Sequence, residues 1–543
     1  MKKLVSILLS TMLILSALTG VFTVSADTPQ TVADLWDGSA NIQWYLDGPD
    51  ADGIYKLNSA EDLAGLAFIV GAGIPAGRYK GVYYTEGGNV VGYVPGASDN
   101  ALWDTDLIPT DFTGLKSVDG DTFTSKKVAL TVDVVLNEGD ASTWSATNAP
   151  ANVWQPIGGN IQAELTDNRA GFDGTFDGQG HTISGMYVSP KKSDIWFSGL
   201  FGMTGSSLGL GTTIKNLTLT NFYVIGCNVG ALIGRTNKYC GVENVKITNG
   251  TVETAEGKAQ AAVFVGGLFG GPGSFQYCAV ENVKVQGYKY LGIFGGCIAY
   301  QDVDVVDCYV KNSSVKGTAQ VGVVAGRMAQ GNITVQNLYA ANVDLEATGD
   351  QTEDSSATKA GAGMIYGVAG NNETANFRKV DGYFFNGTVN GAVVNEYGAD
   401  RVTVLQLSQM TGETAKVFMA GFDYENIWKA VDGDTPIIEL RGNMVDQGGN
   451  DNNDEEEFLP DFDEEEEDDE EEENNNSNNS NNSNTSNKND KNKNDKTETT
   501  AATTEASTEE EKGGMSCGSV VGFSGLMITA ILAGAAVMLK KED

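Results

Sequence analysis

The chain of 543 residues contains a single histidine, His181, and only 35 lysine and arginine residues against 72 aspartate and glutamate residues. One histidine excludes metal sites built from several histidines and most nucleophile–base pairs. The net charge of −37 argues against nucleic-acid binding, because phosphates require lysine and arginine, and against docking of the folded part on anionic lipid. No metal or other cofactor is therefore predicted.

Both ends of the chain carry targeting patterns. Residues 1–26 combine Lys2 and Lys3 with an apolar run and a small-residue site at Ala26, which predicts a secretory signal peptide. Residues 515–539 include about 21 uncharged residues, enough for one transmembrane helix. The lysines in the tail 540–543 place that tail in the cytoplasm. We expect a single pass, with the N-terminus outside and the chain anchored through this helix in the cytoplasmic membrane at the cell surface.

Residues 447–514 are almost entirely acidic residues followed by Asn, Ser, Thr and Lys. Such a segment has little apolar surface to bury and repels itself, which predicts a disordered spacer between the folded region and the membrane.

The region 191–398 contains internal repeats. Apolar strands framed by glycines, such as "GLFG" at Gly199 and "GVVAG" at Gly322, alternate with a second strand pattern that contains an asparagine. No helical periodicity lies between them, and one such repeat cannot bury its own apolar side. The pattern predicts a mainly β fold, a parallel β-helix solenoid in which successive coils stack.

The repeated asparagines are expected to stack at a turn as a structural ladder. They are Asn216, Asn244, Asn282, Asn312 and Asn337. Three cysteines stand four residues before a member of this set, namely Cys240, Cys278 and Cys308. We expect reduced structural thiols in one packing column, although the spacing of stacked strands does not exclude a disulfide. The five exported cysteines cannot all pair internally.

The repeats are flanked by candidate caps. After an N-terminal extension (27–54), the region 55–190 is predicted to hold a capping helix and the first coils. Ser59 with Asp62 indicates the start of that helix, and Leu63, Leu66, Ala67 and Val70 give it an apolar face. The region 399–446, which contains Trp428, is predicted to close the last coil.

The order "YKLNSAEDLAGLA", "VALTVDVVLN", "WQPIG", "FDGTFDGQGHTISGMYV" and repeated "GLFG" strands resembles the GLUG-motif proteins on Gram-positive, clostridia-type bacterial surfaces. The resemblance covers about 55–441. It implies a right-handed parallel β-helix in an exported, adhesin-like surface protein, and it implies no defined reaction. The C-terminal segment is also similar to anchor segments of clostridial surface proteins, but no LPxTG motif precedes it.

Two carboxylates, Asp173 and Asp177, are spaced as a glycosidase pair could be, but the glycines around them favour turns. His181 stands among glycines and is expected to make a hydrogen bond at a turn. Aromatic side chains in the N-terminal loops are candidates for stacking on sugar rings, against the alternative that they belong to the core. These candidates are Trp36, Trp44, Tyr45, Tyr83, Tyr84, Trp103, Trp144 and Trp196.

The sequence therefore favours a surface-anchored adhesin or binding scaffold for a host or plant glycan, a mucin or a surface protein. Two alternatives stay open. One is an architectural stalk without a specific ligand, and the other is a polysaccharide lyase or glycoside hydrolase built on a β-helix.

Overall fold

The computed structural model describes residues 35–72, 81–86, 89–94, 116–118, 120–158, 171–189, 197–206, 209–299, 301–349, 361–369, 376–391 and 401–441. The predicted signal peptide, spacer, transmembrane helix and tail lie outside these residues. Within them, no helix is both long enough and apolar enough to cross a membrane.

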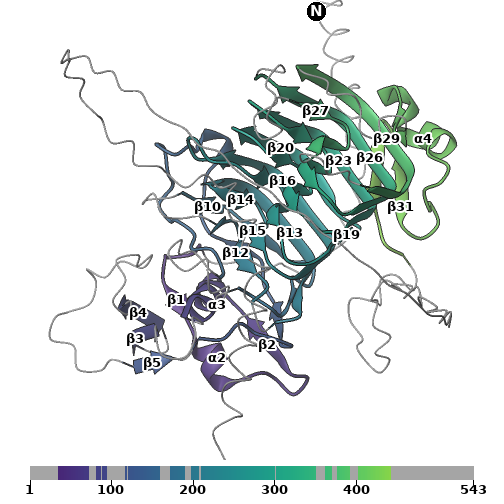
Figure 1. Cartoon of the computed structure of the whole chain (residues 1–543). Coiled ribbons are helices and arrows are strands. Elements are labelled where there is room, and N and C mark those ends of the chain that lie inside the picture. The colour runs from purple at the N-terminus through teal and green to yellow at the C-terminus, as the bar shows by residue number, and fades with distance from the viewer. Residues whose placement is uncertain are drawn as a thin grey trace, which may run out of the picture. The chain divides into compact units, whose positions relative to one another are not determined.

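The structure is mainly β and is dominated by three sheets of parallel strands (Figure 1). The first sheet follows the order β2 (Ile54–Leu57), β6 (Lys127–Leu130), β8 (Thr175–Asp177), β13 (Gly211–Gly226), β16 (Tyr239–Thr254), β19 (Gly273–Gln276), β23 (Val303–Gly317), β26 (Asn332–Ala347), β29 (Asn376–Gly391) and β30 (Thr403–Val404). It also includes β7 (Val134–Val135), β9 (Thr182–Ser184), β10 (Tyr187–Val188) and β20 (Ala279–Gly287). We call it the long sheet.

The other two sheets contain short strands. The second is β11 (Phe197–Ser198), β14 (Asn228–Gly230), β17 (Ala261–Ala262), β21 (Leu291–Gly292), β24 (Val321–Gly322) and β27 (Ala362–Gly363). The third is β12 (Phe201–Thr204), β15 (Ile233–Thr236), β18 (Val265–Leu268), β22 (Gly295–Ala299), β25 (Ala325–Ala329) and β28 (Tyr366–Ala369). The chain visits the three sheets in turn, so each circuit is one coil stacked on the next.

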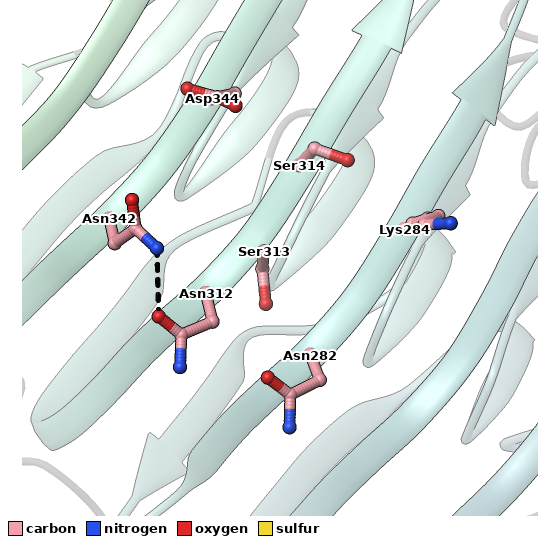
Figure 2. A pocket seen from close by; sticks show the side chains of 7 residues that line it. All are labelled: Asn282, Lys284, Asn312, Ser313, Ser314, Asn342 and Asp344. Carbon is pink, nitrogen blue, oxygen red and sulfur yellow. Dashed lines mark hydrogen bonds between the residues drawn. The ribbon is translucent and has the colours of Figure 1, made fainter.

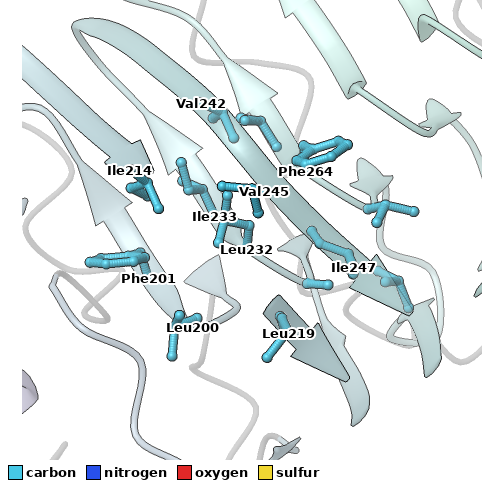
Figure 3. Packing of buried hydrophobic residues seen from close by; sticks show 14 of the residues in the cluster. Leu200, Phe201, Ile214, Leu219, Leu232, Ile233, Val242, Val245, Ile247 and Phe264 are labelled. Atoms are coloured by element: carbon cyan, nitrogen blue, oxygen red, sulfur yellow. The ribbon is translucent and has the colours of Figure 1, made fainter. Parts of the chain in front are cut away.

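The core lies inside the coils, where alternate side chains of each strand point inward (Figure 3). Parallel register stacks like residues along the axis: Ile214 pairs with Val242, and Val242 pairs with Phe275. Phe264 stacks on Phe294 with ring centroids 5.3 Å apart. Each such buried side chain contributes roughly 1.5–3 kcal/mol, so the stacking of coils supplies the burial that a single repeat lacks.

Glycine recurs at one position of the third sheet in six successive coils. The column contains Gly202, Gly234, Gly266, Gly296, Gly326 and Gly367. A Cβ atom at Gly234 would lie 2.7 Å from the backbone oxygen of Gly202, so the neighbouring backbone comes too close here for any side chain. In the third of these coils, Gly266 is the last residue of "VFVG". The "GLFG" motif of this coil begins one residue later, so it does not supply the glycine of this column.

The predicted capping helix is α3 (Ala60–Ala72), and Ser59 Oγ accepts a hydrogen bond from the Asp62 backbone N–H. Its expected amphipathic character is not observed, because Ala64, Phe68 and Ile69 are buried as well as the predicted face. The reason is the N-terminal extension, which covers the far side of the helix. It contributes β1 (Ala40–Asn41) and α2 (Gln43–Asp47), and a Cβ atom at Gly65 would lie only 1.8 Å from the Asn41 backbone oxygen.

A separate antiparallel sheet precedes the coils. It has the order β1, β4 (Asn89–Val94), β3 (Gly81–Glu86) and β5 (Lys116–Val118). A short 3-10 helix, η2 (Ala141–Thr143), follows β7.

The C-terminal segment, 405–441, contains η5 (Leu407–Gln409), α4 (Gly412–Phe418), β31 (Trp428–Val431) and β32 (Asp434–Ile438). It was predicted to close the last coil, but its core packs beside β23 and β26 on the outer face of the long sheet (Figure 1). Trp428 is buried 5.8 Å from the Tyr339 ring, and its Nε1 donates to Asp307 Oδ1 at 3.0 Å. Tyr309 of β23 and Tyr339 of β26 face outward, and the C-terminal segment packs over their rings.

Candidate functional site

Two columns of left-handed residues run across the long sheet, five residues apart in every coil. All have φ between 50° and 57°, a conformation that asparagine tolerates better than most residues. The first column is Asn216, Asn244, Tyr277, Asp307 and Asn337; the second is Asn221, Asn249, Asn282, Asn312 and Asn342.

The predicted single ladder is therefore wrong in its register. Asn216, Asn244 and Asn337 belong to the first column, whereas Asn282 and Asn312 belong to the second. The error arose because each coil offers two equivalent bends and the sequence motif matched either one.

Side-chain amides connect neighbouring coils in both columns. In the second column, Asn282 Nδ2 donates to Asn249 Oδ1 at 3.1 Å, and Asn342 Nδ2 donates to Asn312 Oδ1 at 2.9 Å. In the first column, Asn244 Nδ2 donates to Asn216 Oδ1 at 2.9 Å. The asparagines thus stack at two bends instead of one, and their amides join Asn216 to Asn244, Asn249 to Asn282 and Asn312 to Asn342.

The three cysteines do not share one column either. Cys240 pairs with Gly273, which stands five residues before Cys278, so Cys240 and Cys278 lie in different columns. Cys278 and Cys308 do share a column, and the Cys278 backbone N–H donates to Cys308 Sγ at 3.3 Å. Cys240, Cys278 and Cys308, with Cys297, are buried free thiols, as expected for packing residues. Burial raises the pKa of Cys240 to about 12 and raises that of Cys308 as well, so both stay protonated at neutral pH.

A polar pocket of about 270 Å³ lies over the second asparagine column. Figure 2 shows its side chains in two parallel rows that cross three neighbouring strands, with the asparagines in one row. The second row is Lys284, Ser314 and Asp344, which stand opposite each other in register. We call this pocket, lined by Asn282, Lys284, Asn312, Ser313, Ser314, Asn342 and Asp344, the asparagine groove.

The groove combines exposed hydrogen-bonding side chains with a buried, hydrogen-bonded serine beneath them. Asn282, Asn312, Lys284 and Asp344 are exposed. Ser313 is buried beneath them; its Oγ accepts from the Val283 backbone N–H at 3.1 Å, and Ser313 thereby ties β20 to β23. The rows present amides, a hydroxyl, an ammonium and a carboxylate at the strand spacing of about 4.8 Å. Such an array can hydrogen-bond a hydroxylated ligand at several successive points.

Charge is balanced across the groove. Lys284 and Asp344 stand on either side of Ser314, one strand away each. Asp344 Oδ1 accepts a hydrogen bond from Thr388 Oγ1 at 2.5 Å, which fixes the carboxylate. Lys284 makes no ion pair with any residue in the described part of the chain, so its ammonium is available to a ligand.

The aromatic candidates are not in this groove. Trp36, Trp44 and Trp144 are buried, with exposed fractions of 3%, 8% and 9%. Their prediction as an exposed sugar-binding surface is corrected for these three, because the N-terminal extension and η2 fold over the first coils and bury them.

The remaining aromatic candidates fall into three groups. Tyr45 is partly buried, and its hydroxyl donates to Asp121 Oδ2 at 3.0 Å. Tyr83 and Tyr84 lie in β3 as antiparallel strand residues. Trp103 and Trp196 lie outside the described residues.

The candidate carboxylate pair has separate structural partners. Asp173 is buried and accepts a hydrogen bond from the Ser206 backbone N–H at 2.6 Å, and burial raises its pKa. Asp177 accepts from Asn216 Nδ2 at 3.1 Å, at the start of the first column. Both carboxylates therefore fasten turns to the next coil.

His181 makes the expected hydrogen bond at a turn. Its Nδ1 lies 3.2 Å from Asp133 Oδ1, and its backbone N–H donates to the Gly178 carbonyl at 2.8 Å. Asp133 Oδ1 also accepts from the Thr182 backbone N–H at 2.9 Å. In the described part of the chain, no group of three His, Cys, Asp or Glu residues could hold a metal ion.

The sequence reasoning missed most of the groove. Lys284, Ser314 and Asp344 stand two residues after an asparagine of the second column, on the outward side of the strand. A signal was present, because "NLTLTN" and "NVKITN" each carry two asparagines five residues apart. Aligning the repeats on the second asparagine places the groove residues in register.

Comparisons with known proteins give partial matches. No protein-family model matches the chain. Over 99 residues, 18% of this chain and 10% of the relative, it is 33% identical to a "Putative Gly-rich membrane protein" of Evansella cellulosilytica. Over 142 residues, 26% of this chain and 1% of the relative, it is 33% identical to "Halomucin" of Haloquadratum walsbyi. The matches thus span a tenth or less of each relative's length, and the relatives' names indicate a membrane or surface location.

Among solved structures, the chain is similar to a "putative immunoglobulin A1 protease" from Bacteroides ovatus. The sequence identity is 14%, and the match covers 59% of this chain and 88% of the other, with a TM-score of 0.35. At this TM-score the likeness carries no argument about activity.

Proposed function

We propose that this protein is an exported, membrane-anchored surface protein whose right-handed parallel β-helix is a scaffold that binds a glycan or another host ligand through the asparagine groove. The observation that supports this proposal is the pair of polar rows in register across three coils, which face outward on the long sheet.

The chemistry of the groove suits a polymer of hydroxylated units. Amide, hydroxyl and carboxylate groups hydrogen-bond sugar hydroxyls, and they recur at about 4.8 Å along the stack. This spacing is close to the length of one sugar unit in an extended chain. A chain lying along the stack would therefore meet an asparagine amide at each of three units. The second row would add an ammonium, a hydroxyl and a carboxylate in turn, so that weak contacts add up.

The location proposed for the scaffold rests on the sequence patterns at both ends and on the membrane and mucin names of the partial relatives. The acidic and Asn-rich spacer would hold the scaffold away from the bilayer, because self-repelling charged segments extend. A surface position would expose the groove to host or plant glycans, mucins and surface proteins.

The test is a glycan and mucin array probed with the purified full-length protein and with a groove variant, Lys284→Ser with Asp344→Ser. These substitutions remove both charges of the second row and leave three serines there. The matched control is Lys316→Ser with Glu346→Ser. This control removes an ion pair of 3.2 Å from β23 and β26, outside the groove, and also leaves the net charge unchanged.

We expect the wild type and the control to retain the same glycans and the groove variant to lose most of that signal. Retention of nothing by the wild type would favour the architectural stalk. Equal retention by the groove variant would place binding elsewhere on the molecule. A reducing-sugar and unsaturated-product assay on acidic polysaccharides, with and without calcium, tests the enzyme alternative on the same protein.

A further inference from the structure

A cationic corner lies where the second and third sheets meet, away from the asparagine groove. One side is a column of residues at the start of the second-sheet strands or directly before them: Asn228, Gln260, Tyr290 and Gln320. The other side is a column of the third sheet: Arg235, Gly267, Cys297 and Arg327. The two columns touch, because a Cβ atom at Gly267 would lie 2.8 Å from Gln260 Oε1 and 3.1 Å from Asn228 Oδ1.

Arg235 is held in this corner by aromatic rings. Its guanidinium carbon lies 4.5 Å from the Phe269 ring centroid and 5.6 Å from that of Phe197, and its Nε donates to Asn237 Oδ1 at 2.8 Å. Among the described residues, no carboxylate pairs with Arg235. Burial lowers the pKa of Arg235 to about 10, which still leaves the guanidinium charged at neutral pH.

Two more cations share a single ring two coils further along this corner, that of Tyr290. Lys289 Nζ lies 5.1 Å and the Arg327 guanidinium carbon 5.4 Å from the centroid of Tyr290. Burial and then the charge of Arg327 lower the pKa of Lys289. In the described part of the chain, Lys289 makes no ion pair with a carboxylate.

All three cations act on one buried thiol. Arg327, Arg235 and Lys289 each favour the thiolate of Cys297, but burial outweighs them and raises the pKa of this thiol. Cys297 therefore stays neutral and does not compensate the positive charge.

This arrangement is unusual in a chain with 37 more acidic than basic charges. Several cations elsewhere in the described part of the chain pair with carboxylates, as Lys246 does with Glu281 at 3.0 Å and Lys316 does with Glu346 at 3.2 Å. Holding like charges together in a partly buried place costs free energy that an anion would recover. Guanidinium groups fixed by ring stacking are suited to binding oxyanions in two-point geometry.

We propose that the cationic corner is a binding site for an anionic oxygen group, a sulfate or a carboxylate, carried by a saccharide. Arg235 and Lys289 bind the oxyanion, and the partly exposed Phe269 and Tyr288 rings lie beside these cations, where a sugar ring can stack. The carbonyl oxygen Asn228 Oδ1 is buried and has no hydrogen-bond donor in the described part of the chain, so it can accept from a hydroxyl. This site is independent of the asparagine groove.

The test measures binding of full-length protein to dextran sulfate, carboxymethyl dextran and neutral dextran at fixed ionic strength, with inorganic sulfate as competitor. The variants are Arg235→Gln and Lys289→Gln. The control is Lys379→Gln, which makes the same change of charge at an exposed position of β29. Circular dichroism establishes that each variant is folded.

We expect binding to one or both acidic dextrans, none to neutral dextran, and a roughly tenfold or larger loss in each corner variant, as for a lost charge-assisted hydrogen bond. The preferred dextran identifies the group as sulfate or carboxylate, and competition by sulfate shows that the oxyanion alone is recognised. If folded Lys289→Gln binds the acidic dextrans as tightly as the wild type does, the proposal is overturned. It is also overturned if the control Lys379→Gln loses as much affinity as the corner variants. Absence of binding to both acidic dextrans also overturns it.

Discussion

Replacing Gly326 by alanine tests whether the glycine column sets the distance between coils. A Cβ atom at this position would lie 2.1 Å from the Leu291 backbone nitrogen, and 2.4 Å and 2.7 Å from the carbonyl carbon and Cα atom of Tyr290. All three are backbone atoms of the preceding coil, so no side-chain rotation relieves the contact. Ordinary contact begins near 3.4 Å, so the backbones would have to separate by more than 1 Å.

The separation would break existing hydrogen bonds. The Leu291 N–H donates to the Gln320 carbonyl at 2.9 Å, and the added methyl group would lie against this nitrogen. Overpacking a tight interior costs about 1–3 kcal/mol, and each lost buried hydrogen bond adds about 1 kcal/mol. We therefore expect Gly326→Ala to reduce the free energy of unfolding by about 3 kcal/mol or more.

The assay is chemical unfolding followed by circular dichroism and by tryptophan fluorescence, because stacked repeats need not unfold in one step. The control is Gly421→Ala, where the nearest atom to a new Cβ is Asn337 Oδ1 at an ordinary 3.8 Å. That exposed position should tolerate alanine within about 1 kcal/mol. If the two variants unfold at the same denaturant concentration, the steric reasoning fails.

Three further predictions concern single side chains. His181→Ala should cost on the order of 1 kcal/mol for its lost hydrogen bond and leave ligand binding intact; loss of binding at unchanged stability would contradict the turn role. The thiols of Cys240, Cys278, Cys297 and Cys308 should resist a thiol reagent in the folded protein and react after unfolding, because they are buried; fast reaction of the folded protein would refute their packing role. Burial alone would raise the pKa of Glu281, but hydrogen bonds from Tyr309 and Lys246 outweigh it, and the net pKa is lowered. Its ionised form therefore stabilises the fold above about pH 4.5, and this contribution is lost as pH falls through the folded pKa. Wild type should exceed Glu281→Gln in stability at pH 7, with a difference that shrinks in acid. A constant difference would refute this linkage.

Local patterns predicted the features that depend on local chemistry. Stacked strands followed from apolar runs between glycines, and the start of α3 followed from Ser59 and Asp62. The side-chain amides at the bends followed from the repeated asparagines, because a left-handed residue favours asparagine in any coil.

Features that depend on contacts between distant segments were not predictable. Trp44 and Trp144 stand in loop-like sequence, yet both are buried, Trp44 against Tyr55 and Phe123 and Trp144 against Tyr187. The predicted ladder places Asn282 in the wrong column because its coil carries Tyr277 at the first bend and asparagine only at the second, and only the pairing of Thr248 with Glu281 fixes the register.

Departures from the repeat carry information of their own. The first column has tyrosine and aspartate where asparagine would serve the bend, at Tyr277 and Asp307. Asp307 accepts the Trp428 indole N–H, and Tyr277 packs against the C-terminal segment, so both exceptions lie where a second element covers the sheet. The third-sheet column beside the glycines has no shared residue type, and it carries arginine at Arg235 and Arg327. No described carboxylate covers Arg235, and the oxyanion proposed for that corner would take the place of such a partner.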